Sequence, residues 1–325
     1  MTIPGGKRRA NLALALCAAS RLAACGSAAA TAAATPVSTT TWVFSAPGDT
    51  RGDTALSAVA PRIDAVVSGW IQLDSITGLP IRLHPDDAAR FPSAARRLAL
   101  VTSLHGQRFH PETVRRVAAD HAALALTAGR IGDFVAAGGY QGVVFDLEGQ
   151  SRDDIPLALR FIRAAGDSAR RRGASTIVVA LPAADTTAYP TRAYLAAADF
   201  VTIMLYDEHG PTSAPGPIAS PTWVRRNLAQ RVSDVGAARV VALFPLFGYL
   251  WRPNQPATTL SLDAARRAAA EAGVEITRDP ASHALHANLP NSWELWLNDA
   301  ELLRALRSEA ADLGVTTIAV ASRPL

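Results

Sequence analysis

From Thr41 onward, short apolar runs alternate with Ala- and Arg-rich amphipathic segments. The runs that predict strands are Trp42–Phe44, Ala65–Leu73, Leu98–Thr102, Gly142–Leu147, Ile177–Leu181, Phe200–Leu205, Val240–Leu246 and Thr317–Val320. Helical patterns fall between them, at about 54–62, 111–119, 122–137, 153–172, 191–197, 222–235, 261–272 and 299–313. Strands separated by helices favour a parallel sheet, and this number of them favours a closed (β/α)8 TIM barrel over an open doubly wound sheet. The chain also has no Gly-x-Gly-x-x-Gly turn after its first predicted strand.

A second extended pattern interrupts the barrel repeat between its last two predicted strands. Residues 275–298 contain three short runs with strand character, Glu275–Thr277, Ala284–Ala287 and Trp293–Leu297. We therefore expect an α/β fold in which a small β-rich insertion separates barrel strands seven and eight.

The first 40 residues have the composition of a targeting segment and a tether. Lys7-Arg8-Arg9 precedes the apolar run 10–20, which is too short to span a bilayer. Leu22-Ala23-Ala24-Cys25 resembles a bacterial lipobox. We expect residues 1–24 to be a signal peptide, Cys25 to be lipidated, 25–40 to be an Ala/Thr/Ser-rich tether and 41–325 to form the barrel. Ordinary cleavage after Cys25 is the alternative, so the protein is expected to be either a cell-envelope lipoprotein or secreted.

Charge excludes a nucleic-acid partner, and the scarcity of Cys and Lys excludes two types of catalysis. The chain has 32 basic and 28 acidic residues, and the four bases of residues 1–24 account for the whole excess. A neutral body has no electrostatic footprint for a polyanion. Cys17 and Cys25 are the only cysteines and Lys7 is the only lysine, so residues 41–325 contain neither a thiol nor an amine nucleophile. The membrane is expected to be contacted only through the lipid anchor.

Two acids end the fourth predicted strand. Because side chains alternate along a strand, Asp146 and Glu148 project to the same side, at the C-terminal mouth where barrel enzymes keep their chemistry. Two nearby carboxylates repel, so one of them should have a raised pKa and could act as a general acid. The alternative is a solvated strand end with two ordinary surface acids.

A similar group follows the sixth predicted strand, where Tyr206, Asp207 and Glu208 occupy consecutive positions. A core tyrosine followed by a helix-capping aspartate explains this group equally well. On the first strand, Trp42 and Phe44 alternate with Val43, so both could face the barrel mouth, although core packing suits at least one of them. His105, His110 and His121 have no familiar ligand spacing, and we predict neither a metal nor a cofactor.

These motifs together resemble glycoside hydrolase family 18, the chitinase-like barrels, and in particular its branch of spore-cortex-lytic enzymes and barrels fused to polysaccharide deacetylases. The family's fourth-strand signature Asp-Gly-x-Asp-x-Asp-x-Glu is matched by residues 141–148, and its Met-x-Tyr-Asp signature by 204–207. Residues 215–219, 244–251 and 296–300 match further segments in the same order.

The resemblance implies a substrate-assisted retaining mechanism on glycans that contain N-acetylglucosamine. Glu148 would protonate the glycosidic oxygen, and Asp146 would orient the 2-acetamido group. Tyr206 would hydrogen-bond its carbonyl oxygen. Asp207, Glu208, Phe44, Trp251 and Trp296 are the positions that we expect to bind the substrate.

Two departures from the family pattern favour a second hypothesis. Val144 replaces the middle acid of the signature, which should let Asp146 ionise more readily. The family's eighth-strand Trp, a floor under the reacting sugar, is absent from 318–323, and Trp251 or Trp296 would have to replace it. The alternative function is thus a glycan-binding pseudoenzyme. A metal-dependent polysaccharide deacetylase would act on the same kind of substrate, but this sequence has no credible Asp-His-His set to bind its metal. The sequence leaves the oligomeric state open.

Overall fold

The computed structural model describes residues 39–45, 62–83, 95–106 and 108–322. All of them belong to the compact unit Val37–Leu325. The expected signal peptide 1–24, the lipidation site Cys25, nearly all of the tether and the predicted helix 54–62 lie outside the described residues, apart from Thr39, Thr40 and Arg62 at their ends.

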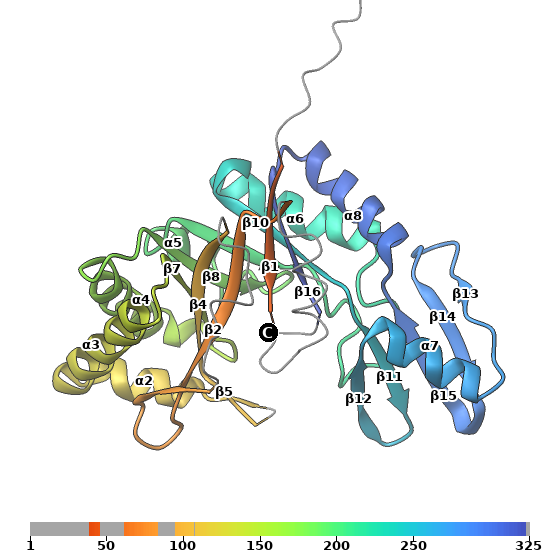
Figure 1. Ribbon diagram of the computed structural model, residues 1–325, viewed down its shortest axis with the longest axis horizontal. Coiled ribbons are helices and arrows are strands. Elements are labelled where there is room, and N and C mark those ends of the chain that lie inside the picture. Colours follow the sequence, from red (N-terminus) through yellow and green to blue (C-terminus); the bar gives the residue numbers. More distant parts are fainter. Residues whose placement is uncertain (1–38, 46–61, 84–94, 107, 323–325) are drawn as a thin grey trace, which may run out of the picture. The chain divides into compact units, whose positions relative to one another are not determined.

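Among the described residues, eight parallel strands close into a barrel (Figure 1). Their order is β1 (Thr40–Phe44), β2 (Ala65–Leu73), β4 (Arg96–Thr102), β7 (Gly142–Asp146), β8 (Thr176–Pro182), β9 (Phe200–Met204), β10 (Val240–Pro245) and β16 (Thr317–Ala321). Strand β1 pairs with both β2 and β16, which closes the ring. The (β/α)8 barrel expected from the sequence is therefore confirmed.

The barrel interior is filled by side chains that alternate along the strands. Large residues on β1 face small ones on β16, since Trp42 is in register with Ala319 and Phe44 with Ala321. All four belong to one buried interior cluster together with Val144. Trp42 and Phe44 are 1% and 3% exposed, so the expectation of core packing is confirmed for both.

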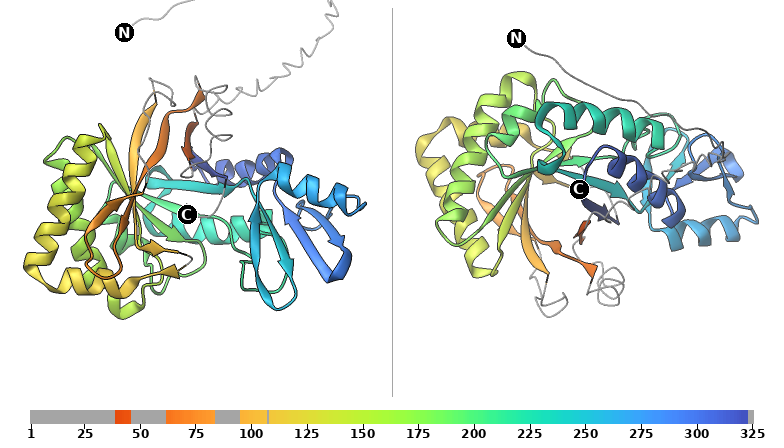
Figure 2. Two further views of the ribbon diagram at one scale, coloured as in Figure 1. Left: turned by 60° about the horizontal axis from the view of Figure 1, so that its bottom comes forward. Right: turned by 90° about the horizontal axis from the view of Figure 1, so that it is seen from above.

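Helices cover the outer face of the barrel strands (Figure 2). They are α2 (Pro111–Ala119), α3 (His121–Ala137), α4 (Ile155–Arg170), α5 (Thr191–Leu195), α6 (Pro221–Val235) and α8 (Ala300–Asp312). Side chains cap three of these helices: Asp120 accepts from Ala123 N, Ser220 from Trp223 N and Asp299 from Leu302 N. Within the described residues, no helix is long and apolar enough to cross a membrane.

The insertion is larger than the sequence pattern predicted. It forms a sheet of β12 (Gln255–Leu260), β11 (Gly248–Arg252), β15 (Trp293–Leu297), β14 (Leu285–Leu289) and β13 (Thr277–Arg278). Helix α7 (Leu262–Glu271) packs on this sheet through Ala265 and Ala269, which contact Leu250 and Leu295 in a separate small core. The insertion thus begins at Gly248, directly after β10, and not near residue 275.

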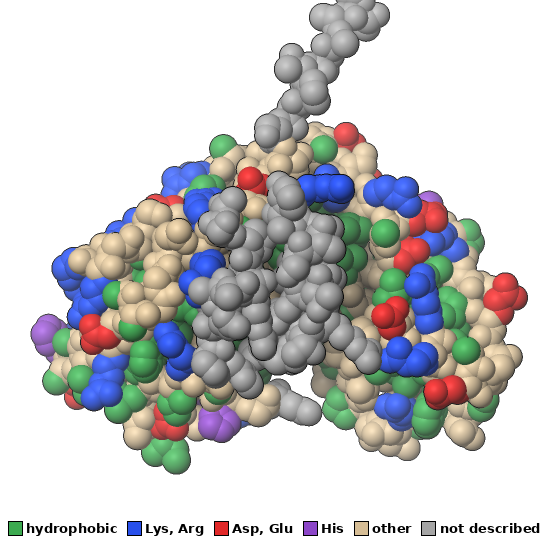
Figure 3. All heavy atoms as spheres, viewed as in Figure 1, with side chains coloured by type: hydrophobic (Ala, Val, Ile, Leu, Met, Phe, Trp, Pro, Cys, Tyr) green, Lys and Arg blue, Asp and Glu red, His purple; other side chains and the backbone are tan. Residues whose placement is uncertain are grey.

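Short elements complete the described chain. Strand β3 (Pro80–Arg82) pairs antiparallel with β2, and β5 (Leu104–His105) with β6 (Arg108–Phe109). Single turns of 3-10 helix lie at Arg152–Asp154, Ala237–Arg239 and Pro290–Ser292. On the face shown in Figure 3, acidic and basic side chains are interspersed over the described surface.

Candidate active site

Asp146 ends β7 and points into the barrel. It is fully buried, and its Oδ2 accepts a hydrogen bond of 3.1 Å from Oγ1 of Thr102, its partner in register on β4. Its Oδ1 is buried with no hydrogen-bond partner among the described residues. Burial raises the pKa of Asp146 to about 7, which the hydrogen bond from Thr102 only partly opposes. A buried oxygen without a hydrogen-bond donor, such as Oδ1 of Asp146, is suited to accept a hydrogen bond from an N–H group of a ligand.

Val144 lies one layer deeper on β7, where it is fully buried and in register with Leu100 and Val178. The sequence led us to expect that this apolar residue would let Asp146 ionise readily. Instead, burial dominates and keeps the pKa of Asp146 high. An apolar layer beneath a carboxyl group removes the water that would stabilise its charge.

Glu148 lies two residues beyond Asp146 and remains partly accessible. Burial of its carboxyl group raises its pKa well above the usual value, and repulsion from Asp146 and Asp207 raises it further. The three carboxyl groups are therefore close enough to compete for protons at the mouth of the barrel. In such a cluster, a carboxylic acid that stays protonated near neutral pH can serve as a general acid.

Tyr206 follows β9 and is 6% exposed within the interior cluster that also contains Val144. Its ring meets the edge of Phe247 with a centroid separation of 5.8 Å. Tyr206 and Asp146 thus lie at the C-terminal ends of β9 and β7, at the same end of the barrel, and only β8 lies between these two strands.

Asp207 and Glu208 differ in their contacts, although they are adjacent in the chain. Asp207 has a left-handed backbone conformation (φ 64°), and its Oδ1 accepts a hydrogen bond of 2.8 Å from the hydroxyl of Tyr249 on β11. Burial raises the pKa of Asp207 to about 6, which this hydrogen bond partly opposes. Glu208 instead accepts from the backbone N (2.7 Å) and the hydroxyl (3.0 Å) of Ser220, which holds the start of α6.

The aromatic residues predicted to bind substrate have different surroundings. Phe44 is buried inside the barrel, which leaves little of it for a ligand. Trp296 is partly exposed, but its ring packs against His286 in a tilted arrangement at a centroid separation of 4.3 Å. Trp251 is 4% exposed, meets Tyr249 edge-on at 5.4 Å, and lines a groove of about 490 Å³ between the β9–α6 loop and the β11–β12 hairpin. The indole N–H groups of Trp251 and Trp296 are buried without a hydrogen-bond partner among the described residues.

Where the resemblance led us to expect a Trp on the eighth strand, β16 presents Ala319 and Ala321 to the interior. The large side chains in register with these alanines are Trp42 and Phe44 on β1. On β2, the indole N–H of Trp70 donates a hydrogen bond of 3.0 Å to Ser45 O. Aromatic volume on neighbouring strands therefore occupies the barrel next to β16.

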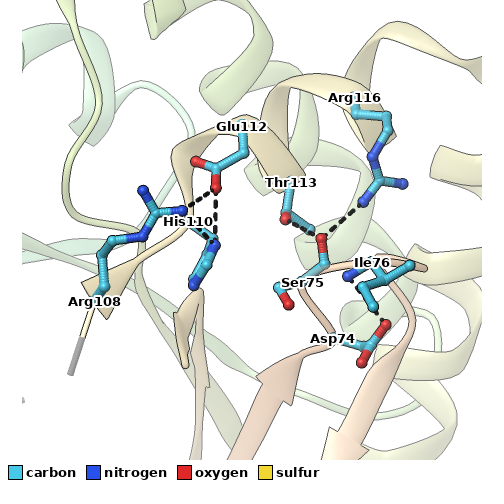
Figure 4. Close-up of polar contacts among 8 residues, drawn as sticks. All are labelled: Asp74, Ser75, Ile76, Arg108, His110, Glu112, Thr113 and Arg116. Atoms are coloured by element: carbon cyan, nitrogen blue, oxygen red, sulfur yellow. Dashed lines mark hydrogen bonds and ion pairs between the residues drawn. The ribbon is translucent and has the colours of Figure 1, made fainter. Parts of the chain in front are cut away.

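Polar contacts join the turn after β2 to the start of α2 (Figure 4). The carbonyl oxygen of Ser75 accepts from Thr113 Oγ1 at 2.9 Å and from Arg116 at 3.2 Å. Glu112 accepts from Arg108 at 2.6 Å and lies 2.8 Å from Nδ1 of His110. His110 thus belongs to an ion-pair cluster, and no group of three or more metal-ligand side chains occurs among the described residues.

Sequence reasoning missed three residues that hold the site together: Thr102, Tyr249 and Tyr189. Tyr189 lies between β8 and α5, and its hydroxyl accepts from the backbone N of Gln150 at 2.9 Å. The side-chain amide of Gln150 is buried with no partner among the described residues. Only Thr102 had a usable signal, because it ends the strand that precedes β7.

Comparisons with known proteins support the barrel fold. No family model matches the chain. The Bacillus subtilis protein YdhD, provisionally named a sporulation-specific glycosylase, is 32% identical over 187 residues, which cover 54% of this chain and 44% of YdhD. The chain therefore spans less than half the length of this curated relative.

Two solved structures share the fold over nearly the whole described chain. A chitinase from Chromobacterium violaceum superposes with a TM-score of 0.76 at 20% identity, covering 88% of this chain and 94% of the other. The spore cortex-lytic enzyme SleL of Bacillus cereus gives 0.74 at 19% identity, covering 88% and 71%. The expected resemblance to the chitinase-like barrels and their cortex-lytic branch is thus confirmed.

Proposed function

We propose that this protein is a glycoside hydrolase that cleaves glycans containing N-acetylglucosamine by a substrate-assisted retaining mechanism. The observation that carries the proposal is the convergence of Asp146, Glu148 and Asp207 at one strand mouth, with the pKa of Glu148 raised well above its usual value. Resemblance to a chitinase, a cortex-lytic enzyme and YdhD supports the substrate class.

In the proposed reaction, the protonated carboxyl of Glu148 donates its proton to the glycosidic oxygen as the bond to the anomeric carbon breaks. The carbonyl oxygen of the sugar's own 2-acetamido group attacks that carbon from the opposite face and closes a positively charged oxazolinium ring. Tyr206 holds this oxygen in line through its hydroxyl. Water then attacks the anomeric carbon while the carboxylate of Glu148 takes up its proton, and the original anomeric configuration returns.

Asp146 has two tasks in this scheme, and its surroundings suit both. Its unpaired Oδ1 would accept the acetamido N–H, and its negative charge would stabilise the oxazolinium. Because its pKa is about 7, Asp146 can exchange a proton with its neighbours near neutral pH without an acid at position 144.

The competing function is a glycan-binding pseudoenzyme with the same mouth. Val144 and the alanines of β16 favour it, because members of the family use an acid and a Trp at those places. For both functions, we propose that the chain is exported through its first 24 residues and is either anchored by a lipid on Cys25 or secreted freely.

Turnover of N-acetylglucosamine oligomers and of purified peptidoglycan separates the two functions. We expect the wild-type protein to cleave at least one of them. Glu148→Gln should abolish cleavage while largely sparing binding, since the amide keeps the shape but cannot donate the proton. Glu294→Gln, a partly exposed position on the insertion, is the matched control and should keep full activity. Binding of these glycans by the wild-type protein without any cleavage would establish the pseudoenzyme.

A further inference from the structure

A side chain of the insertion reaches into the carboxyl cluster. Tyr249 lies on β11 and is fully buried. Its hydroxyl donates a hydrogen bond of 2.8 Å to Asp207 Oδ1. The ring is held between Phe247, at a centroid separation of 5.4 Å, and Trp251, also at 5.4 Å. Burial, and then the charge of Asp207, raise the pKa of the Tyr249 hydroxyl far above its usual value, so it remains a donor at every pH of interest.

The backbone of Asp207 directs its carboxyl group toward this donor. Its φ of 64° lies in the left-handed region, which costs a non-glycine residue free energy unless its surroundings compensate. The neighbouring Glu208 fixes the chain on the other side by accepting from Ser220. Asp207 is therefore held in a strained conformation between two anchors, and Tyr249 is the anchor that contacts its carboxyl group.

The charges around Asp207 make its ionisation depend on the hydrogen bond from Tyr249. From β7 and the loop that follows it, Asp146 and Glu148 contribute negative charge, and from β11 comes the neutral phenol of Tyr249. Among the described residues, no basic side chain contributes to the pKa shifts of these three carboxyl groups. The Tyr249 hydroxyl is thus the group that favours ionised Asp207, and ionised Asp207 in turn repels a second negative charge on Glu148.

We propose that Tyr249 is a positioning residue: by fixing the Asp207 carboxylate, whose charge repels that of Glu148, it lets the insertion sheet set the protonation of the general acid. This inference deepens the proposed glycosidase function and rests on it. The insertion then affects the protonation of Glu148, because its first strand, β11, contains the hydrogen-bond donor Tyr249.

The test is the pH dependence of kcat/KM for Tyr249→Phe. Without the hydroxyl, Asp207 becomes neutral at a higher pH and repels Glu148 less, so the pKa of Glu148 falls. The basic limb of the profile should therefore move to lower pH, on the order of half a unit. Tyr140→Phe is the matched control, since it removes a buried phenol on the outer face of the barrel, and it should leave the profile unchanged.

Combining the substitution with Asp207→Asn separates this role from general loosening of the fold. Asp207→Asn alone should shift the basic limb in the same direction, and adding Tyr249→Phe should produce no further shift. If Tyr249→Phe shifts the limb equally in both backgrounds, or does not shift it in the wild-type background, the inference is overturned.

A readout independent of turnover keeps the inference distinct from the proposed function. The carboxyl carbon of Asp207, followed by NMR in 13C-aspartate-labelled protein, should titrate at higher pH in Tyr249→Phe than in the wild type. Inactive wild-type protein would refute the glycosidase, whereas the same Asp207 titration in both proteins would refute the role of Tyr249.

Discussion

Replacing Arg231 with methionine should destabilise the fold and loosen one side of the site. The Arg231 guanidinium is fully buried on α6 and donates five hydrogen bonds to residues from the end of β8 to the start of α5. Its acceptors are the carbonyl oxygens of Pro182, Ala183, Asp185 and Tyr189 and the hydroxyl of Thr191. All of its N–H groups are thus used to hold the segment that carries Tyr189, whose hydroxyl supports the loop after Glu148.

The magnitude follows from two opposing contributions. Hydrogen bonds from a charged donor contribute roughly 1.5 kcal/mol each, and all five would be lost. Burial lowers the pKa of Arg231 to about 10 against the partly opposing charges of Asp234 and Asp185, and this net shift corresponds to a cost of about 3 kcal/mol that methionine would not have. The net decrease in the free energy of unfolding should therefore be about 4 kcal/mol, or a fall in Tm of roughly 10 °C for a unit of this size.

Urea unfolding followed by circular dichroism measures this difference. Arg226→Met, at an exposed position of the same helix, is the control and should change stability by less than about 0.5 kcal/mol. At temperatures where the variant stays folded, kcat should also fall, because Tyr189 is no longer held. A decrease of less than about 1 kcal/mol for Arg231→Met would show that these hydrogen bonds do not anchor the segment.

Four further substitutions, at Asp146, Val144, Gly142 and Gly129, test the site and the packing of the barrel. Asp146→Asn should be more stable than the wild type at pH 8 and similar to it at pH 4 in urea unfolding. A folded pKa of about 7, above the unfolded value of about 4, makes wild-type stability fall as pH rises between those values; a constant difference would contradict this. Val144→Asp adds a carboxyl group beneath Asp146, so repulsion should move the acidic limb of the pH–rate profile upward; an unchanged limb would place the two side chains too far apart. Gly142→Ala should destabilise by about 1–3 kcal/mol in thermal unfolding, because the new Cβ would lie 2.6 Å from the carbonyl oxygen of Thr176. Gly129→Ala, with open space around it, should instead stabilise α3 slightly.

The barrel could be predicted because its signal is local. Each strand is buried on both faces and therefore appears as an apolar run, and the amphipathic helices separate these runs clearly. The start of the insertion was harder to predict, because a local apolar pattern does not show which sheet a strand joins. Gly248–Arg252 continues the apolar run of β10 almost without a break, so its pattern gives no sign that β11 belongs to another sheet.

From the residues alone, only groups that are close in sequence could be placed together, and the link from Asp146 and Glu148 to Tyr206 and Asp207 came from the resemblance to a known family. Asp146 ends β7 and Glu148 lies two positions beyond it, so the alternation of an extended chain places them on the same side. The contact of Asp207 with Tyr249 joins residues 42 positions apart, and that of Thr102 with Asp146 joins residues 44 apart. Such pairs depend on strand register and on where the insertion docks, which are properties of the assembled fold.

In the proposed mechanism, the mouth of the barrel stabilises a sugar whose acetamido group has closed on its own anomeric carbon. The most direct test of this mechanism is calorimetric binding of an N-acetylglucosamine-derived thiazoline, a stable mimic of that cyclised sugar. We predict that it binds the wild-type protein at least about 100-fold more tightly than N-acetylglucosamine does, and that Asp146→Ala abolishes the difference. Equal affinity of the wild-type protein for the two compounds would contradict the substrate-assisted mechanism.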